Sequence, residues 1–197
     1  MKNPTIAVIE KKVLSDGHYK MYRYKFSYTD EGIDQVQTRE VFDRGDGVAV
    51  LLYNAMKQSV ILTRQFRLPT MLNENPSGMM LEVCAGTLAQ HEDPTDCARR
   101  EVTEETGYTI DRLDAVGTFY MSPGAVTEKL HLYIAQVDDS QRTGTGGGLA
   151  SEHENIEVVE IPFYALKKMF DQGDILDAKT AILIQALTLR RLDTEHD

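Results

Sequence analysis

Hydrophobic and polar positions alternate along the first forty residues. Between residues 20 and 28 every second position is aromatic: Tyr22, Tyr24, Phe26 and Tyr28. A period of two is typical of a β-strand with one buried face. The apolar run at 6–9 and the segment 36–42, set off by turn residues at Gly17 and 30–32, predict two further strands. A three-stranded piece is marginal in water, so we expect it to pack on the rest of the chain or on a second copy.

The middle of the chain has a different pattern. Residues 47–53 and 59–63 are almost continuously apolar, which is typical of central strands buried on both faces. Four more segments have the composition of strands: 79–83, 115–120, 130–137 and 156–161. Three segments have helical periodicity or helix boundaries: the dozen residues before Gly107, 163–170 and 178–192.

Composition narrows the function classes. A chain of 197 residues with 42% hydrophobic content supports one well-packed domain with a small appendage. With 21 basic and 31 acidic residues the net charge is −10, which disfavours duplex DNA or an anionic membrane as the main partner. The sequence has neither a spanning apolar run nor a signal peptide, so we expect a cytoplasmic protein. Cys84 and Cys97 fit neither a disulfide framework nor a zinc site and are interpreted as buried small residues.

One predicted helix carries crowded acidic residues. Glu101, Glu104 and Glu105 are three and four positions apart, so their carboxylates project from one helix face and repel one another. A divalent cation removes that repulsion, and hard oxygen donors suit Mg²⁺ or Mn²⁺. The alternative is a solvated acidic surface, which would be preferred for this short fragment alone.

The wider spacing around the helix favours the metal. The segment 86–108 resembles the Nudix box at every fixed polar position and glycine of that motif: Gly86, Glu92, Arg100, Glu101, Glu104, Glu105 and Gly107. One mild departure is Tyr108, where the family usually has an aliphatic residue. The resemblance implies an α+β fold, with a mixed β-sheet sandwiched between helices at 43–197. An antiparallel β subdomain at 1–42 would mediate dimerisation.

The resemblance also implies a chemistry, which is Mg²⁺-dependent hydrolysis of a diphosphate linked to another group, with Mn²⁺ as a substitute ion. Glu101 and Glu105 would bind the metal together with the backbone carbonyl of Ala85 and with Glu154. Glu104 would be a third or water-mediated ligand. Arg100 would orient a carboxylate by pairing with a glutamate such as Glu92.

The catalytic base is expected in a loop beyond the box. Residues 144–148 are rich in glycine and predict a mobile loop, which would let the following residues close over substrate. By resemblance, Glu154 is the first candidate for the base and Glu152 the second. His153 between them is a candidate substrate contact. The alternative is that all three are solvated loop residues.

Several further segments carry a finer resemblance: 39–41, 43–45, 64–67, 84–86, 120–124, 141–142, the glycine run and 179–180. In these segments the chain is similar to Nudix enzymes that hydrolyse GDP-mannose. Pro123, sixteen residues beyond Gly107, resembles a marker of ADP-ribose-hydrolysing members. The similarity implies these substrate-binding residues: His18, Thr38, Arg39, Glu40, Arg67, Ala85, Gly86, Thr87, Glu105, Glu128, His153 and Lys179. Among them, residues 38–40 would reach the substrate from the other subunit of a homodimer. The similar GDP-mannose enzymes have a tyrosine near position 18 that is suited to stacking on the nucleobase, whereas this chain has His18 followed by Tyr19, and either ring could stack there.

We therefore predict a nucleotide-sugar pyrophosphatase that converts GDP-mannose and water to GMP and mannose 1-phosphate. An ADP-ribose pyrophosphatase, giving AMP and ribose 5-phosphate, is the nearest alternative, because the box and Pro123 serve both reactions. A non-catalytic nucleotide-sugar sensor is the alternative of another class. Three crowded carboxylates disfavour a sensor, since a protein that only binds has no need of them.

Overall fold

The computed structural model describes residues 3–152 and 154–194. Its contacts divide the chain into two compact units, each with its own sheet. The first unit combines Met1–Asp46 with Tyr120–Lys129, and the second combines Gly47–Phe119 with Leu130–Asp197.

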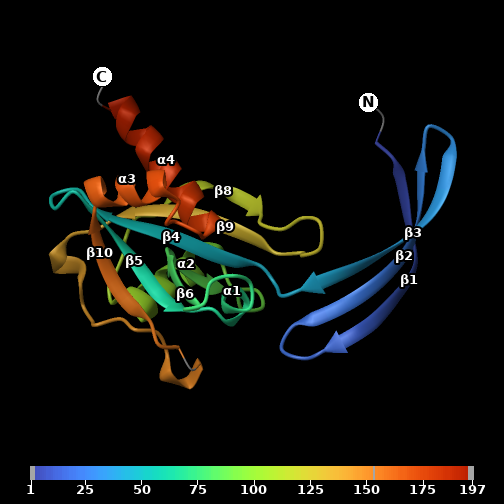
Figure 1. The fold of residues 1–197 in the computed structure, drawn as a ribbon, viewed down its shortest axis with the longest axis horizontal. Helices are drawn as coiled ribbons and strands as arrows, with labels where there is room; N and C mark the ends of the chain where they lie inside the picture. The colour runs from blue at the N-terminus through green and yellow to red at the C-terminus, as the bar shows by residue number, and fades with distance from the viewer. Residues whose placement is uncertain (1–2, 153, 195–197) are drawn as a thin grey trace. The chain divides into compact units, whose positions relative to one another are not determined.

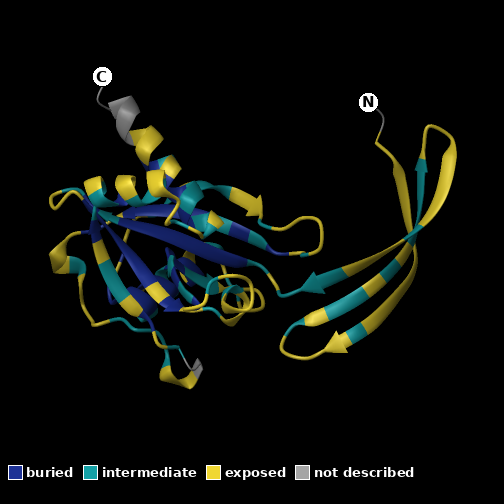
Figure 2. Ribbon diagram, in the orientation of Figure 1, coloured by how far each residue is buried: buried dark blue, intermediate teal, exposed yellow. Residues whose placement is uncertain are grey.

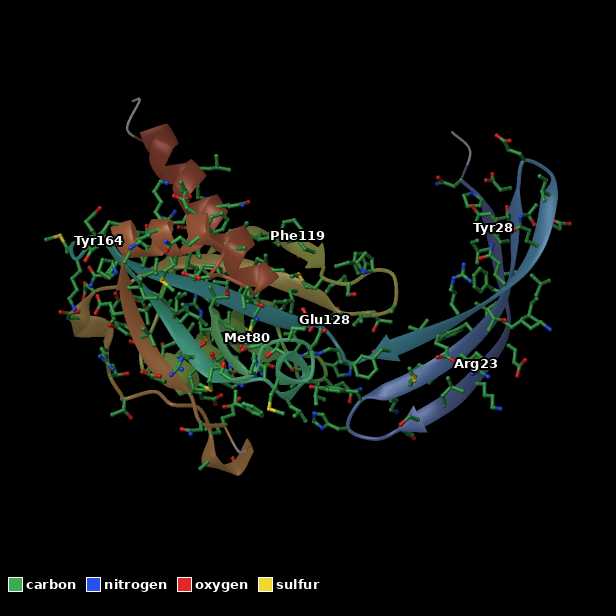
Figure 3. All side chains as sticks on the ribbon, in the orientation of Figure 1. Arg23, Tyr28, Met80, Phe119, Glu128 and Tyr164 are labelled. Carbon is green, nitrogen blue, oxygen red and sulfur yellow. The ribbon has the colours of Figure 1, made fainter. Side chains whose placement is uncertain are left out.

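The first unit contains an antiparallel three-stranded sheet in the order β1-β2-β3. Its strands are β1 (Thr5–Asp16), β2 (Lys20–Asp30) and β3 (Ile33–Asp43). Glu31 and Gly32 connect β2 to β3 with positive φ angles of 50° and 82°. A two-residue turn with both φ angles positive matches the right-handed twist of a hairpin. The strands are exposed or half-buried along most of their length (Figure 2).

The segment 120–129 is tied to the end of β3. The backbone N–H of Phe42 donates to the carbonyl of Ala125 (2.8 Å), and the N–H of Thr127 donates to the carbonyl of Phe42 (3.0 Å). A side-chain hydrogen bond from Thr127 to Asp43 (3.0 Å) adds to this pairing. These bonds join two stretches that are far apart in the sequence.

The second unit contains a seven-stranded mixed sheet in the order β10-β5-β4-β9-β8. Its strands are β4 (Gly47–Asn54), β5 (Ser59–Phe66), β6 (Met79–Glu82), β7 (Cys84–Thr87), β8 (Asp114–Tyr120), β9 (Lys129–Gln136) and β10 (Glu157–Pro162). Strand β4 pairs in parallel with β9 and antiparallel with β5 and β7. Strands β4 and β5 pair with each other from Leu52 and Ile61 to Asn54 and Ser59. The other end of β5 pairs with β6, and the other end of β4 pairs with β7.

Helices cover this sheet (Figure 1). They are α1 (Leu68–Met71), α2 (Pro94–Thr106), α3 (Phe163–Gln172) and α4 (Ala178–Thr194), with short 3-10 turns η1 (Asp139–Gln141) and η2 (Ala150–Glu152). Val48, Val50 and Leu52 of β4 belong to a core cluster with residues of α2. Successive residues of a strand point to opposite faces, so Ala49 and Leu51 face the other side, where α4 contacts β4. Strand β4 is buried on both faces, as its apolar run predicts (Figure 2).

The predicted fold class is confirmed, with a mixed sheet, covering helices and an N-terminal antiparallel sheet. Cys84 and Cys97 are both free and buried, as expected. Among the helices that the structure describes, none is sufficiently long and apolar to cross a membrane.

Candidate active site

The acidic helix α2 is defined by residues at both ends. The carboxylate of Asp93 caps it by accepting from the backbone N–H of Thr95 (2.8 Å), and Pro94 occupies the first helical position. Gly107 ends it in the left-handed conformation, with φ 75°. Ala98 and Val102, four positions apart on one face of the helix, are fully buried in the core cluster. The helix is therefore fixed in register against β7.

The carboxyl group of Glu101 lies directly against the backbone of Gly86. A Cβ atom at Gly86 would stand well under 3.0 Å from the carboxyl carbon and from Oε1 of Glu101. Only glycine allows this approach without displacing the glutamate. The close approach that Gly86 permits therefore has a specific partner, the carboxyl group of Glu101.

Glu105 is the most deeply buried of the three helix carboxylates, with 1% of its surface exposed. Its Oε2 accepts a hydrogen bond from the backbone N–H of Ala85 (3.1 Å). The Cys84 thiol also hydrogen-bonds this carboxylate. Glu104, by contrast, is half-buried. One helix face therefore presents acids in two different environments, although the sequence pattern treats them alike.

Burial and mutual repulsion perturb these carboxyl groups. Burial raises the pKa of Glu105 to about 8, and the negative charges of Glu101 and Glu154 add to the increase against the two hydrogen bonds. Burial also raises the pKa of Glu101, opposed by its pairing with Arg100. A carboxyl group held mostly protonated at neutral pH beside two other acids is a site that favours a cation.

Arg100 binds three carboxylates at once. Its Nε and Nη2 donate to the two oxygens of Glu92 (3.0 and 3.3 Å), and its Nη1 donates to Glu101 (2.8 Å) and Glu104 (3.0 Å). The predicted pair with Glu92 is confirmed. Planar guanidinium geometry makes this orientation specific. Arg100 therefore fixes Glu101 and Glu104 relative to the loop before the helix.

The glycine run is hydrogen-bonded to the C-terminus of α2. The N–H groups of Gly147 and Gly148 donate to the carbonyls of Glu105 (2.9 Å) and Glu104 (3.1 Å), and the N–H of Gly144 donates to the carbonyl of Gly107 (3.0 Å). These bonds satisfy carbonyls that a helix end leaves without partners. The sequence predicted a mobile loop here, and did not indicate this attachment to the acidic helix.

Glu154 is brought to the α2 carboxylates by this attachment. Its Oε2 accepts from the backbone N–H of Leu149 (3.0 Å), and a Cβ atom at Gly148 would collide with it. Its charge acts on both Glu101 and Glu105. Glu152 ends the short turn η2, and His153 lies outside the described residues.

Two predicted phosphate-binding cations lie together on the same unit. Arg67, just after β5, and Lys179, in the first turn of α4, both donate to Glu82. Lys179 is largely buried and also pairs with Asp177 (2.9 Å). Lys179 is therefore not a solvated surface charge. Thr87 ends β7 and is exposed.

The remaining predicted substrate contacts belong to the first unit. Thr38, Arg39 and Glu40 are exposed on β3, with Glu40 paired to Arg23 of β2 (2.6 Å). His18 is exposed and its ring contacts that of Tyr19. Glu128 is buried and pairs with Arg44 (3.3 Å).

The donor chemistry around α2 suits a hard divalent cation. Glu101, Glu105 and Glu154 supply carboxylate oxygens that interact unfavourably with one another, and Gly86 leaves room for the Glu101 carboxyl group beside Ala85. Over the described part of the chain, no three His, Cys, Asp or Glu side chains are gathered closely enough to hold an ion as they stand. The chemical nature of these residues, rather than a preformed cage, is what fits the ion.

Comparison with known proteins shows the family of the chain. Residues 43–180 match the model of the NUDIX domain family, which is more than half of the chain. The chain belongs to the Nudix family. It is also similar along nearly its whole length to proteins named GDP-mannose pyrophosphatase. The relative from Pectobacterium atrosepticum is 47% identical, covering 96% of this chain and 97% of the relative. Those from Cronobacter sakazakii and Shigella flexneri are 46% and 43% identical, covering 94% and 95% of this chain and 96% and 97% of the relatives.

The expected membership in the Nudix family and the expected class of enzyme, a Nudix-type hydrolase, are therefore confirmed. Nudix hydrolases generally use divalent metal ions. Sequence reasoning missed Glu82, Asp177 and the thiol of Cys84 at this Nudix site. Glu82 lies in an apolar strand, and a lone charged residue in such a strand was the one available signal.

Proposed function

We propose that this Nudix hydrolase cleaves the pyrophosphate bond of GDP-mannose, giving GMP and mannose 1-phosphate. The reaction class rests on one observation: the carboxyl group of Glu101 lies against Gly86 and that of Glu105 accepts from the N–H of Ala85, with Glu154 near enough to act electrostatically on both. The choice of nucleotide sugar rests on the whole-length similarity to proteins named GDP-mannose pyrophosphatase.

Mg²⁺ is the proposed ion, with Mn²⁺ able to replace it. Glu101, Glu105, Glu154 and the carbonyl of Ala85 would hold it, and Glu104 would act directly or through water. A bound ion would neutralise diphosphate oxygens and lower the pKa of water. Arg100 supports this set by holding Glu101 and Glu104 in place.

Glu154 is proposed as the base that accepts the proton of the attacking water. Water oxygen bonds to phosphorus, the bond from that phosphorus to the bridging oxygen breaks, and the bridging oxygen leaves with the other phosphate. The electrostatic effect of Glu154 on both Glu101 and Glu105 supports this role. Glu152 is the second candidate.

Positively charged side chains would help to neutralise the negative charge of the diphosphate. Arg67 and Lys179 are proposed to contact phosphate oxygens, and Gly86 and Thr87 to border them. The proposed contacts for the sugar and the nucleobase are Glu128, His18 and His153. Removing Arg67 or Lys179 should raise KM more than it lowers kcat, because the metal carboxylates are untouched.

We propose that a second copy of the chain supplies Thr38, Arg39 and Glu40 to the site. Six large apolar residues of the three-stranded sheet are more than half exposed: Ile6, Val8, Ile9, Val13, Ile33 and Val36. An apolar surface of this kind marks an interaction site. Size-exclusion chromatography with light scattering should give twice the chain mass of 22.2 kDa. A monomer at all concentrations would remove these three residues from the site.

A panel of initial rates tests the reaction. GDP-mannose, ADP-ribose, ADP-glucose, FAD and diadenosine polyphosphates are compared with and without Mg²⁺. We expect GDP-mannose to have the highest kcat/KM and chelator to abolish turnover. A preference of about tenfold or more for ADP-ribose, a free-energy difference of about 1.4 kcal/mol, would make ADP-ribose the proposed substrate in place of GDP-mannose. Thermal protection by GDP-mannose without any turnover would indicate a sensor.

A further inference from the structure

Two cations from separate parts of the second unit meet on one buried carboxylate. Arg67 Nε donates to Glu82 Oε2 and Lys179 Nζ donates to Glu82 Oε1, each at 2.8 Å. Glu82 ends β6 and is 4% exposed. Each of its two oxygens therefore accepts a hydrogen bond from a charged donor.

The first turn of α4 is tied to the same place. Asp177 accepts from the backbone N–H and the hydroxyl of Thr180 (2.9 and 2.5 Å), and the Thr180 hydroxyl accepts from the backbone N–H of Val83 (2.8 Å). Val83 lies two residues before Ala85, the proposed carbonyl ligand. The network therefore joins α4 to the strand that enters the metal site.

The geometry at Arg67 leaves donors available. The pair with Glu82 uses Nε, and across the described chain no hydrogen bond from either Nη nitrogen of Arg67 is recorded. Its side chain is 40% exposed, whereas that of Lys179 is 12% exposed. A guanidinium anchored through Nε can present its two terminal nitrogens to a phosphate without losing the anchor.

Charge balance limits what the cluster can do alone. Arg67 and Lys179 contribute two positive charges, and Glu82 and Asp177 two negative charges. A neutral cluster gives little long-range attraction for an anion. Its value to a diphosphate lies in fixed donor positions, which lower the entropy lost when the anion binds.

We propose that Glu82 is a positioning residue for substrate binding: it holds Arg67 and Lys179 in place for the phosphate groups of the nucleotide sugar. This inference rests on the proposed function of the site. Glu82 would not touch the substrate. It acts through the two cations, and its loss should therefore appear in KM rather than in the chemical step.

A purely structural role predicts something else. In that case Glu82 would only stabilise the contact between β6 and α4. Its substitution would lower the unfolding free energy and leave the KM of the folded fraction unchanged. Measurements of KM and of stability on the same variants separate the two roles.

The test is Glu82→Gln, compared with Glu157→Gln as the matched control. Glu157 also pairs with an arginine of β5, since Arg64 Nη1 lies 3.0 Å from its Oε2, but that pair is exposed on the β5–β10 side of the sheet. An amide can accept from one of the two cations and opposes the other with its own N–H groups.

For Glu82→Gln we expect KM to rise about tenfold, the order for one charge-assisted hydrogen bond lost. The kcat and the Mg²⁺ concentration for half-maximal activity should stay within about twofold of the wild type. Glu157→Gln should leave all three unchanged. An unchanged KM for Glu82→Gln, or a fall confined to kcat, would overturn the proposal.

If Glu82→Gln does not fold, Glu82→Asp takes its place, because aspartate keeps the charge but withdraws the carboxylate from both cations by one methylene group, and KM should still rise. A double-mutant cycle with Arg67 gives a second readout. Arg67→Lys keeps the charge but loses the Nε anchor, so it should raise KM similarly. The double variant with Glu82→Gln should then raise KM by less than the product of the two single fold-increases, because both changes act through one contact. Fully multiplicative effects would show that Glu82 does not act through Arg67.

The wild-type substrate panel keeps this test separate from the proposed function. If another nucleotide sugar is preferred, GDP-mannose hydrolysis fails, and the KM comparison is made with the preferred compound. If no compound is turned over, the GDP-mannose concentration for half-maximal thermal protection replaces KM. It should rise for Glu82→Gln and not for Glu157→Gln, and equal values would overturn the role of Glu82.

Discussion

Gly86 on β7 and Glu101 on α2 lie so close together that the glutamate's carboxyl group occupies the space that a Cβ atom at position 86 would need. This contact couples the strand that carries Ala85 to the helix that carries the proposed metal ligands. Neither residue alone specifies the position of the other. Strand and helix must be in the observed register for the two to meet.

The Gly86→Ala variant should therefore stay folded but be poorly active. The added methyl group must displace Glu101, and we expect a loss of about a hundredfold in kcat/KM, with ~1–3 kcal/mol lost in stability from overpacking. Gly124→Ala is the control, because a Cβ atom there meets nothing within 4 Å. Its activity and melting temperature should match the wild type. Normal activity of Gly86→Ala would show that Glu101 need not hold its place.

The pattern of the sequence predicted most of the secondary structure. Apolar continuity at 47–53 and 59–63 and the residues Pro94 and Gly107 around α2 are local signals, and the elements they predict are present. The four-residue helix α1 and the short strand β7 were missed. Each is too brief to show a period.

The candidate site was predicted unevenly for a similar reason. Glu101 and Glu105 lie on one helix, so their proximity follows from helical geometry. Glu82 and Lys179 are 97 residues apart, and their pair depends on α4 docking at the end of β6. The glycine run has no local signal that it hydrogen-bonds to the carbonyls of α2, since flexible glycine segments usually behave as loops. Contacts made by tertiary packing are the ones that a single sequence does not reveal.

The raised pKa of Glu105 predicts a pH-dependent stability in the absence of metal. The folded-state pKa is raised from 4.5 to about 8, so between these values the folded state holds one proton that the unfolded state has lost. The unfolding free energy should therefore fall as pH rises through this window and level off above it. Glu101, whose pKa is raised by burial, contributes in the same direction. Urea unfolding in chelator from pH 5 to pH 9 measures the slope.

Glu105→Gln is the control for that slope, which should become shallower. An unchanged slope in this variant would assign the effect to other groups. A rise in the unfolding free energy of the wild type between pH 5 and pH 8 would contradict the raised pKa itself.

Metal binding should release the same proton. A carboxylate must be ionised to bind Mg²⁺, so the apparent affinity should increase with pH by up to about tenfold per unit below the pKa and become constant above it. Calorimetry at pH 6.5 in buffers with different ionisation enthalpies should detect about one proton released per ion, against almost none at pH 9. Equal proton release at both values would exclude Glu105 from the ligand set.

Glu105→Gln should change activity and stability in opposite directions. The amide can still accept from the N–H of Ala85, but it supplies no charge to a metal. Loss of ~3 kcal/mol of transition-state stabilisation would lower kcat more than a hundredfold. Without metal at pH 9, however, the variant should resist urea better than the wild type, because a buried negative charge beside Glu101 and Glu154 is gone. An active, metal-dependent Glu105→Gln enzyme would remove Glu105 from the site.

The choice between the two loop glutamates depends on their different positions. Glu154 acts electrostatically on both Glu101 and Glu105, while Glu152 ends the turn η2. Glu154→Gln should lower kcat by about 10² to 10⁴, the range for a lost general base. Glu152→Gln should remain within about threefold of the wild type, as for a residue outside the reaction.

The order of the two losses decides between these glutamates. A larger loss of kcat in Glu152→Gln than in Glu154→Gln would make Glu152 the base. The hydrogen bond from Leu149 to Glu154 can be kept by glutamine, so a loss of activity would not come from detachment of this loop.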